Sequence, residues 1–210
     1  CVAVVYGILG YDPPGIGRLV SALFGIGGLV WTYLLGRDLA RRALDEQRAR
    51  RVGLLAALSL GLSIEYFSTG HRIVADGALT FFTTGATWSF FRALSSPERS
   101  GRLWWLMAAH AMASLGFLSK SFMVLAAPAL AVLALAVVLR KARILRDARP
   151  WLAPLVLGAM VFPWAFLLWR ELGSAGLREV FVENFLGRVL PGKEGSRGHL
   201  QPLYYYWLQV

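Results

Sequence analysis

Three long segments of this chain carry no charged side chain, and they limit what it can fold into. The segments are 19–36, 121–139 and 150–169, with 18, 19 and 20 residues. A helix of about 20 apolar residues spans the hydrocarbon core of a bilayer. Lipid offers no hydrogen-bond partner to backbone groups, so a spanning segment must satisfy them internally, as a helix does. The sequence therefore predicts an all-α, polytopic transmembrane helical bundle.

Composition supports this class, because 57% of the 210 residues are hydrophobic and the mean hydropathy is +0.54. A soluble domain is nearer half apolar, with its apolar residues dispersed. Here they gather in blocks that predict about six spans: 19–36, 52–69, 76–92, 103–118, 121–139 and 151–170.

Three domains are expected from this pattern. Residues 1–170 form a transmembrane helical region with short loops. Residues 171–198 are predicted to form an amphipathic helix and a loop on the outer face, because their apolar positions recur at roughly helical spacing. Residues 199–210 open a further membrane segment, and more spans are expected beyond Val210.

The net charge of +10 is explained by topology. The loops 37–51, 92–102 and 140–149 hold 14 of the 22 Lys and Arg residues and alternate with less basic links. Basic loops stay in the cytoplasm, so the turn at 70–75 and the residues after 170 are predicted to lie outside. The charge therefore indicates contact with membrane lipids and not with nucleic acid.

The chain begins with Cys1 and not with Met, so we expect it to be a fragment that lacks an N-terminal part. Cys1 is also the only cysteine. A disulfide framework and a cysteine-based metal site are therefore excluded within the sequence.

The stretch "FSTGHRIVADGALTFF" (67–82) places an arginine and a carboxylate at the start of an apolar segment. Asp76 has two interpretations: a helix cap favoured by the dipole, or an acidic group facing an outer cavity. Glu65 precedes it by eleven positions across a short turn. The two carboxylates either share a face and act in metal binding or proton transfer, or Glu65 pairs with Arg72 or reaches into solvent.

Arg72 and Lys120 fall at predicted outer ends of spans, against the charge bias. They either bind a phosphate group or reach to the membrane surface as interfacial side chains. His110, in the middle of a span, favours an interhelical hydrogen bond over a ligand role. His199 follows a glycine-rich loop and is either a metal ligand or a plain loop residue.

Four stretches together resemble a known family of membrane enzymes. They are "RLVSALFGIGGLVWTYLLGRDL", "ARRVGLLAALSLGLSIEYFSTGHRIVADGALTFF", "ASLGFLSKSFMVLAAPAL" and "FVENFLGRVLPGKEGSRGHLQPLYYY". In this order they resemble the polyprenyl-phosphate-sugar-dependent glycosyltransferases with the GT-C fold (glycosyltransferase family 39). That family includes the aminoarabinose transferase of lipid A and the protein O-mannosyltransferases.

The resemblance implies a multi-pass enzyme of the bacterial inner membrane that moves a sugar from a polyprenyl-phosphate carrier, such as undecaprenyl phosphate, to a lipid or protein acceptor outside. Its usual general base belongs to a loop expected before residue 1, and Asp12 does not match that motif. On the matching positions, Asp76 is implied as catalytic. The implied donor-phosphate ligands are Arg72, Lys120 and Arg188.

The last of the four stretches matches a family pattern that implies further site residues. Together with Glu65, the implied substrate-binding residues are Glu183, Asn184, Tyr204 and Tyr205. The resemblance leaves a divalent metal open as a cofactor, with His199 as a ligand. Asn184 stands where some members have His, which weakens the case for a metal.

Two other functions stay open at this stage. A transporter or lipid flippase would use Glu65, Asp76 and His110 as a proton or coupling path, although the inverted repeat typical of many transporters is not found here. The second alternative function is a scaffold of membrane spans without catalysis. An acidic pair upstream of Cys1 would favour the transferase. The residues do not specify the sugar or the acceptor.

Overall fold

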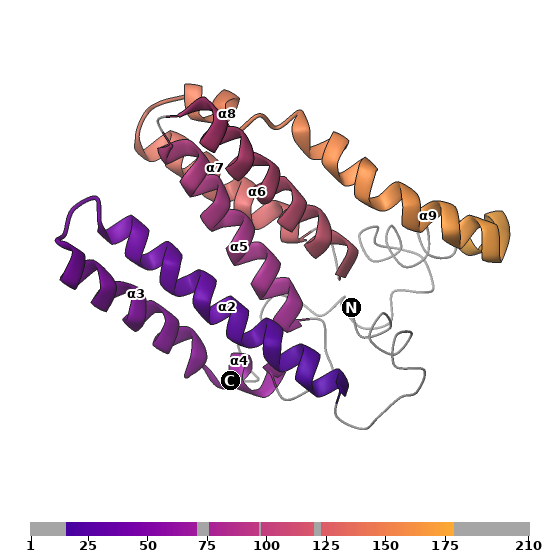
Figure 1. Cartoon of the computed structure of the whole chain (residues 1–210), viewed down its shortest axis with the longest axis horizontal. Coiled ribbons are helices and arrows are strands. Elements are labelled where there is room, and N and C mark those ends of the chain that lie inside the picture. Colours follow the sequence, from indigo (N-terminus) through magenta and orange to yellow (C-terminus); the bar gives the residue numbers. More distant parts are fainter. Residues whose placement is uncertain (1–15, 71–75, 97, 120–122, 179–210) are drawn as a thin grey trace, which may run out of the picture. The chain divides into compact units, whose positions relative to one another are not determined.

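The computed structural model describes residues 16–70, 76–96, 98–119 and 123–178. It divides into two compact units, Cys1–Met160 and Val161–Val210. All regular elements among the described residues are helices (Figure 1), which confirms the all-α prediction. They are α2 (Ile16–Ala40), α3 (Glu46–Gly61), α4 (Ile64–Gly70), α5 (Asp76–Ser95), α6 (Arg99–Ser119), α7 (Met123–Val138), α8 (Arg143–Asp147) and α9 (Leu152–Arg178).

In the first unit, α2 and α5 lie side by side and run in the same direction (Figure 1). At their N-terminal ends the backbones approach closely, since a Cβ added to Gly77 would lie 3.3 Å from the carbonyl oxygen of Ser21. Further along, the rings of Trp31 and Trp88 lie 5.1 Å apart. Small residues at such crossings let membrane helices pack backbone to backbone.

Helices α3 and α6 return antiparallel to α2 and α5. A Cβ on Gly53 of α3 would lie 2.6 Å from the carbonyl oxygen of Tyr33 in α2, so this pair also depends on a glycine. Between α5 and α6, Trp88 meets Trp105 edge to face, with ring centroids 5.0 Å apart. The parallel pair α2–α5 is thus flanked by α3, which packs on α2, and by α6, which packs on α5.

The buried core lies between α5, α6 and α7. One cluster gathers Phe90, Leu106 and Val132. A second cluster joins Phe82 to Val124. Gly116 makes the second cluster possible, because a Cβ there would lie 2.8 Å from the Cβ of Phe82.

The predicted span 52–69 is wrong as a single helix. The structure ends α3 at Gly61 and begins α4 at Ile64. The hydroxyl of Ser63 lies 3.4 Å from the backbone nitrogen of Tyr66, as in an N-cap, and donates to the carbonyl oxygen of Leu60 at 2.8 Å. A serine that satisfies backbone groups on both sides of a break favours a new helix start over continuation.

The chain's last described helix, α9, continues beyond the predicted span 151–170. Its backbone leaves the helical region at Gly173, where φ is 65° and ψ is −165°. Glycine adopts this conformation without the steric cost of a Cβ. The break falls three residues after the predicted end of the span. Of the predicted outer segment 171–198, residues 179–198 lie outside the described residues.

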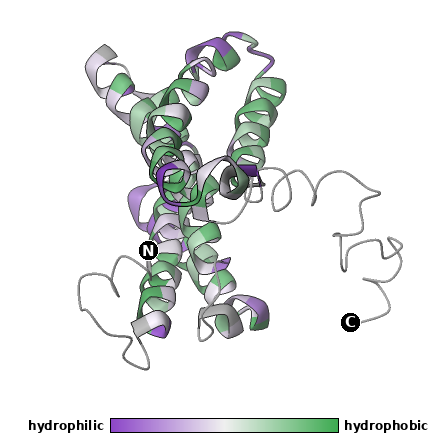
Figure 2. Ribbon diagram, turned by 90° about the vertical axis from the view of Figure 1, so that its right-hand side faces the viewer, coloured by the Kyte–Doolittle hydropathy of each residue, from purple (hydrophilic) through white to green (hydrophobic). Residues whose placement is uncertain are grey.

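Within the described part of the chain, two helical segments are long and apolar enough to cross a membrane, Gly17–Ala40 and Arg143–Gly176. The apolar stretch Val124–Val138 is shorter. Figure 2 shows apolar residues along the helices and hydrophilic residues mainly near helix ends. Many large apolar side chains are exposed, among them Leu23, Ile26 and Leu55. The count of six spans stays a prediction.

Candidate functional site

Two predicted site residues lie among the described residues, at the end of the bundle where α4 and α5 begin. Asp76 is the first residue of α5, and Glu65 lies in the first turn of α4. The Asp76 side chain is half-buried, and the Thr80 hydroxyl donates to its backbone carbonyl at 3.1 Å. A carboxylate in a first helical turn is stabilised by the helix dipole, so the capping interpretation of Asp76 fits its position. We call this end the carboxylate end.

A groove of about 560 Å³ opens at the carboxylate end between α2 and the α3–α4 junction. Its walls are apolar and include Leu19, Ile26 and Phe67, while Arg18 lies at its rim. The Tyr66 hydroxyl donates to the carbonyl oxygen of Gly25 at 2.6 Å and ties α4 to α2. The groove therefore combines a long apolar surface with one cation.

Arg18 and Asp76 belong to the same corner of the fold. Gly77, next to Asp76, packs against the backbone of Ser21, which is one helical turn from Arg18. Glu65 is exposed on α4, and α4 packs on both α2 and α5. The sharing of one face by Glu65 and Asp76 stays a prediction.

The other predicted site residues lie outside the described residues. These are Arg72, Lys120, Glu183, Asn184, Arg188, His199, Tyr204 and Tyr205. Among the residues that are described, no three His, Cys, Asp or Glu side chains gather as metal ligands would.

His110 occupies an interhelical position, as the sequence predicted. It is buried in α6, and its Nε2 lies 3.3 Å from the carbonyl oxygen of Ala148 at the end of α8. Phe90 of α5 meets the imidazole edge to face, with ring centroids 5.1 Å apart. The ring thus joins three segments by packing and a hydrogen bond.

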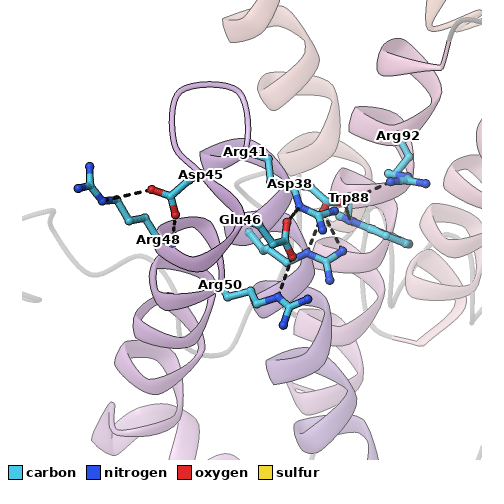
Figure 3. A network of polar contacts seen from close by, with 9 residues as sticks. Asp38, Arg41, Asp45, Glu46, Arg48, Arg50, Trp88 and Arg92 are labelled. Carbon is cyan, nitrogen blue, oxygen red and sulfur yellow. Dashed lines mark hydrogen bonds and ion pairs between the residues drawn. The ribbon is translucent and has the colours of Figure 1, made fainter.

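A network of ion pairs lies at the opposite end of α2 and α5, which we call the arginine end (Figure 3). Asp38 is its centre and is only 7% exposed. Oδ1 of Asp38 accepts from Nη2 of Arg37 at 2.9 Å and lies 3.5 Å from Nη1 of Arg41. Oδ2 accepts from Nε1 of Trp88 at 3.1 Å and lies 3.5 Å from Nη1 of Arg92.

The network continues into the loop between α2 and α3 (Figure 3). Glu46 accepts hydrogen bonds from Arg41 and, at 2.7 Å, from Nε of Arg50. These two hydrogen bonds lower the pKa of the Glu46 carboxyl to about 2. The Asp45 side chain accepts from the backbone N–H of Arg48 at 2.9 Å and caps α3. Asp45 and Glu46 therefore each accept a hydrogen bond from an arginine side chain or a backbone N–H.

Sequence reasoning missed the roles of Arg18 and Asp38. Arg18 stands directly before the charge-free run 19–36, and under the predicted topology it opposes the positive-inside bias in the same way as Arg72 and Lys120. That shared property was a signal for the groove. The basic stretch 37–51, which contains Asp38, was explained by membrane topology alone. The available signal was that Asp38 is an acidic residue between arginines, directly after a charge-free run.

The chain matches a family model over residues 16–169, that of the dolichyl-phosphate-mannose-protein mannosyltransferases. This range contains every described helix from α2 to α8 and most of α9. The chain belongs to this family of polyprenyl-phosphate-sugar glycosyltransferases, as its resemblance predicted.

A curated relative is the undecaprenyl phosphate-alpha-4-amino-4-deoxy-L-arabinose arabinosyl transferase 1 of Proteus mirabilis (strain HI4320). It is 28% identical over 187 residues, which cover 83% of this chain and 31% of the relative. The chain thus spans about a third of the length of that relative. No solved structure matches the chain.

Proposed function

We propose that this protein is a membrane glycosyltransferase that moves a sugar from a polyprenyl-phosphate carrier to a lipid or protein acceptor on the outer face of a bacterial inner membrane. Family membership supports the reaction class, and the name of the Proteus relative supports an undecaprenyl-linked donor. The observation that carries the proposal is the groove at the carboxylate end, where an apolar surface meets the cation of Arg18.

The groove suits an isoprenoid carrier on physical grounds. Its apolar walls include Ile26 and Phe67. They would suit an isoprenoid chain, because such a chain has no polar atoms that need hydrogen-bond partners. The rim residue Arg18 offers a planar fork of donors that suits a phosphate group. A carrier lying in the groove would thus have its phosphate at the same corner as Asp76.

Transfer breaks the bond between the sugar's anomeric carbon and the phosphate oxygen, and a new bond forms from that carbon to the acceptor oxygen. The phosphate leaves with the bonding electron pair, and cations near it stabilise the developing charge. Arg18 is suited to that task, and we extend it to Arg72, Lys120 and Arg188. Asp76 then accepts the proton of the acceptor hydroxyl.

Further residues implied by the family resemblance are proposed to contact the substrates. The sugar or the acceptor contacts Glu65, Glu183, Asn184, Tyr204 and Tyr205. If the reaction uses a divalent metal, His199 is its ligand.

Titration of the purified protein in nanodiscs with undecaprenyl phosphate tests the groove, with thermal unfolding as the readout. Losing a charge-assisted contact to phosphate should weaken binding by about tenfold in Arg18→Gln. The matched control is Arg51→Gln, which also removes an exposed charge, in the N-terminal half of α3. Equal affinities for the two variants would exclude Arg18 as a carrier ligand.

A second pair of variants tests the apolar wall. Ile26 lines the groove and is 60% exposed, whereas Leu23, on the same helix and 59% exposed, does not line it. Ile26→Trp should fill the groove and lower carrier affinity, and Leu23→Trp should leave it unchanged. If Leu23→Trp lowered affinity as much, the carrier would not lie in the groove.

Asp76→Asn separates binding from chemistry. It should retain carrier affinity and slow sugar transfer by about 100-fold or more, the range of general base catalysis. The assay follows a labelled sugar from carrier to acceptor. Unchanged turnover would remove Asp76 from catalysis and leave the groove assignment standing.

A further inference from the structure

A second hollow lies at the arginine end, between the C-terminal ends of α2 and α5. It has a volume of about 330 Å³, and its lining includes Asp38, Arg41, Arg42, Arg92, Ser95 and Trp105. Three guanidinium groups thus face one carboxylate, which leaves the lining with an excess of positive charge. We call this hollow the arginine pocket.

The charges in the arginine pocket are unequally paired. Asp38 is held closely by Arg37, while Arg41 also pairs with Glu46. Arg92 stands 3.5 Å from Asp38, at a looser distance. Arg42 has no carboxylate in the ion pairs found among the described residues, so its charge is uncompensated there.

Aromatic rings hold the two less-paired guanidinium groups. The Arg42 guanidinium lies over Phe91, 4.9 Å from the ring centroid, and that of Arg92 lies over Trp105 at 5.2 Å. Nη2 of Arg42 also donates to the Ser95 hydroxyl at 2.5 Å. A guanidinium carries its N–H donors in its own plane, so a ring against its face leaves donors free at its edges. Such a fork matches the oxygens of a phosphate.

The position of the pocket indicates the source of that phosphate. The pocket joins the loops 37–51 and 92–102, which the charge pattern predicts to lie at the cytoplasmic surface. Basic pockets between helices on that side bind the headgroups of anionic lipids. We propose that the arginine pocket binds the phosphate of an anionic membrane lipid, with Arg42 and Arg92 as its ligands.

This site is separate from the carrier groove and independent of the transferase proposal. Arg18 lies in the first turn of α2 and Arg42 lies two residues beyond its end at Ala40; at 1.5 Å per residue, the helix from Arg18 to Ala40 alone rises about 33 Å. A variant that fails in one site should therefore leave the other intact.

The test compares two arginines close together in the sequence, Arg42 in the turn after α2 and Arg48 in the first turn of α3. Arg42→Gln and Arg48→Gln remove the same charge, but Arg48 pairs with Asp45 and does not line the pocket. The protein in zwitterionic micelles is titrated with dihexanoyl phosphatidylglycerol, and thermal unfolding is followed by circular dichroism. We expect saturable stabilisation, a half-saturation about tenfold higher in Arg42→Gln, and no change in Arg48→Gln.

Other results would overturn the proposal. Equal weakening by the two substitutions would show a general attraction to anionic surfaces. Absence of saturable stabilisation would show that the pocket holds no lipid phosphate. Inorganic phosphate and glycerol phosphate form a further arm, and equal stabilisation by either at the same concentration would replace the lipid with a free anion. Arg42 is not among the arginines that pair with Asp38, so the Arg42→Gln variant is expected to fold.

Discussion

Replacing Asp38 with asparagine tests whether the arginine end stabilises the bundle. The substitution keeps the size of the side chain and an oxygen for the Trp88 N–H, and removes the charge that faces Arg37, Arg41 and Arg92. Breaking a buried ion pair by removing one partner costs about 3–5 kcal/mol, because the other charge stays buried. Here the side chains of Arg41 and Arg92 are 41% exposed and Arg41 keeps Glu46, so water offsets part of that cost and we expect about 2 kcal/mol, below that range.

The assay is unfolding of the purified protein by SDS in mixed micelles, followed by far-ultraviolet circular dichroism. The matched control is Asp45→Asn at the N-cap of α3, where the side chain is 59% exposed against 5% for Asp38. Asparagine caps helices as well as aspartate, so the control should lose only a surface ion pair, about 0–1 kcal/mol. Equal losses for Asp38→Asn and Asp45→Asn would refute the reasoning, since burial would then not decide the cost.

Gly53→Ala should lower the free energy of unfolding by about 1–3 kcal/mol in the same assay, because its Cβ would overlap the Tyr33 backbone. Gly25→Ala is the control: a Cβ there meets nothing within 4 Å, so a comparable loss would contradict the packing argument. The pKa of Glu46 is about 2 against 4.5 when unpaired, so its contribution to stability is complete above pH 4.5 and is lost as the pH falls through 2. Glu46→Gln should therefore reduce the change in unfolding free energy with pH in that interval. If the pH dependence stayed the same, it would come from other titrating groups. Tyr66→Phe should cost about 1 kcal/mol, since it removes the hydrogen bond to Gly25, and full stability would show that this bond does not hold α4.

The sequence predicted the helices that coincide with charge-free runs. The run 19–36 lies wholly inside α2, and α7 lies wholly inside the run 121–139. Hydropathy records such helices because the runs hold no charged residue and most of their residues are apolar. The division of 52–69 was missed, because Ser63 breaks the helix through local hydrogen bonds that a hydropathy average does not record.

The site was predictable where a residue opposes its surroundings along the chain, as Asp76 does. Asp38 was not found, because its role depends on Trp88 and Arg92, which lie about fifty positions away in sequence. The parallel alignment of α2 with α5 brings them together. Local patterns do not contain that alignment, since α3 and α4 separate the two helices along the chain.

The length of α2 also bears on how the protein would fit a bilayer. From Arg18 to Asp38 the helix rises about 30 Å, which is the thickness of a typical hydrocarbon core. Cations stand at both ends, and at the Asp38 end the ion pairs join α2 to α5. A bilayer several ångströms thicker or thinner would have to deform around the pair or tilt it as one body, because neither helix can slide alone. Membrane thickness would then act on the groove and on the arginine pocket together.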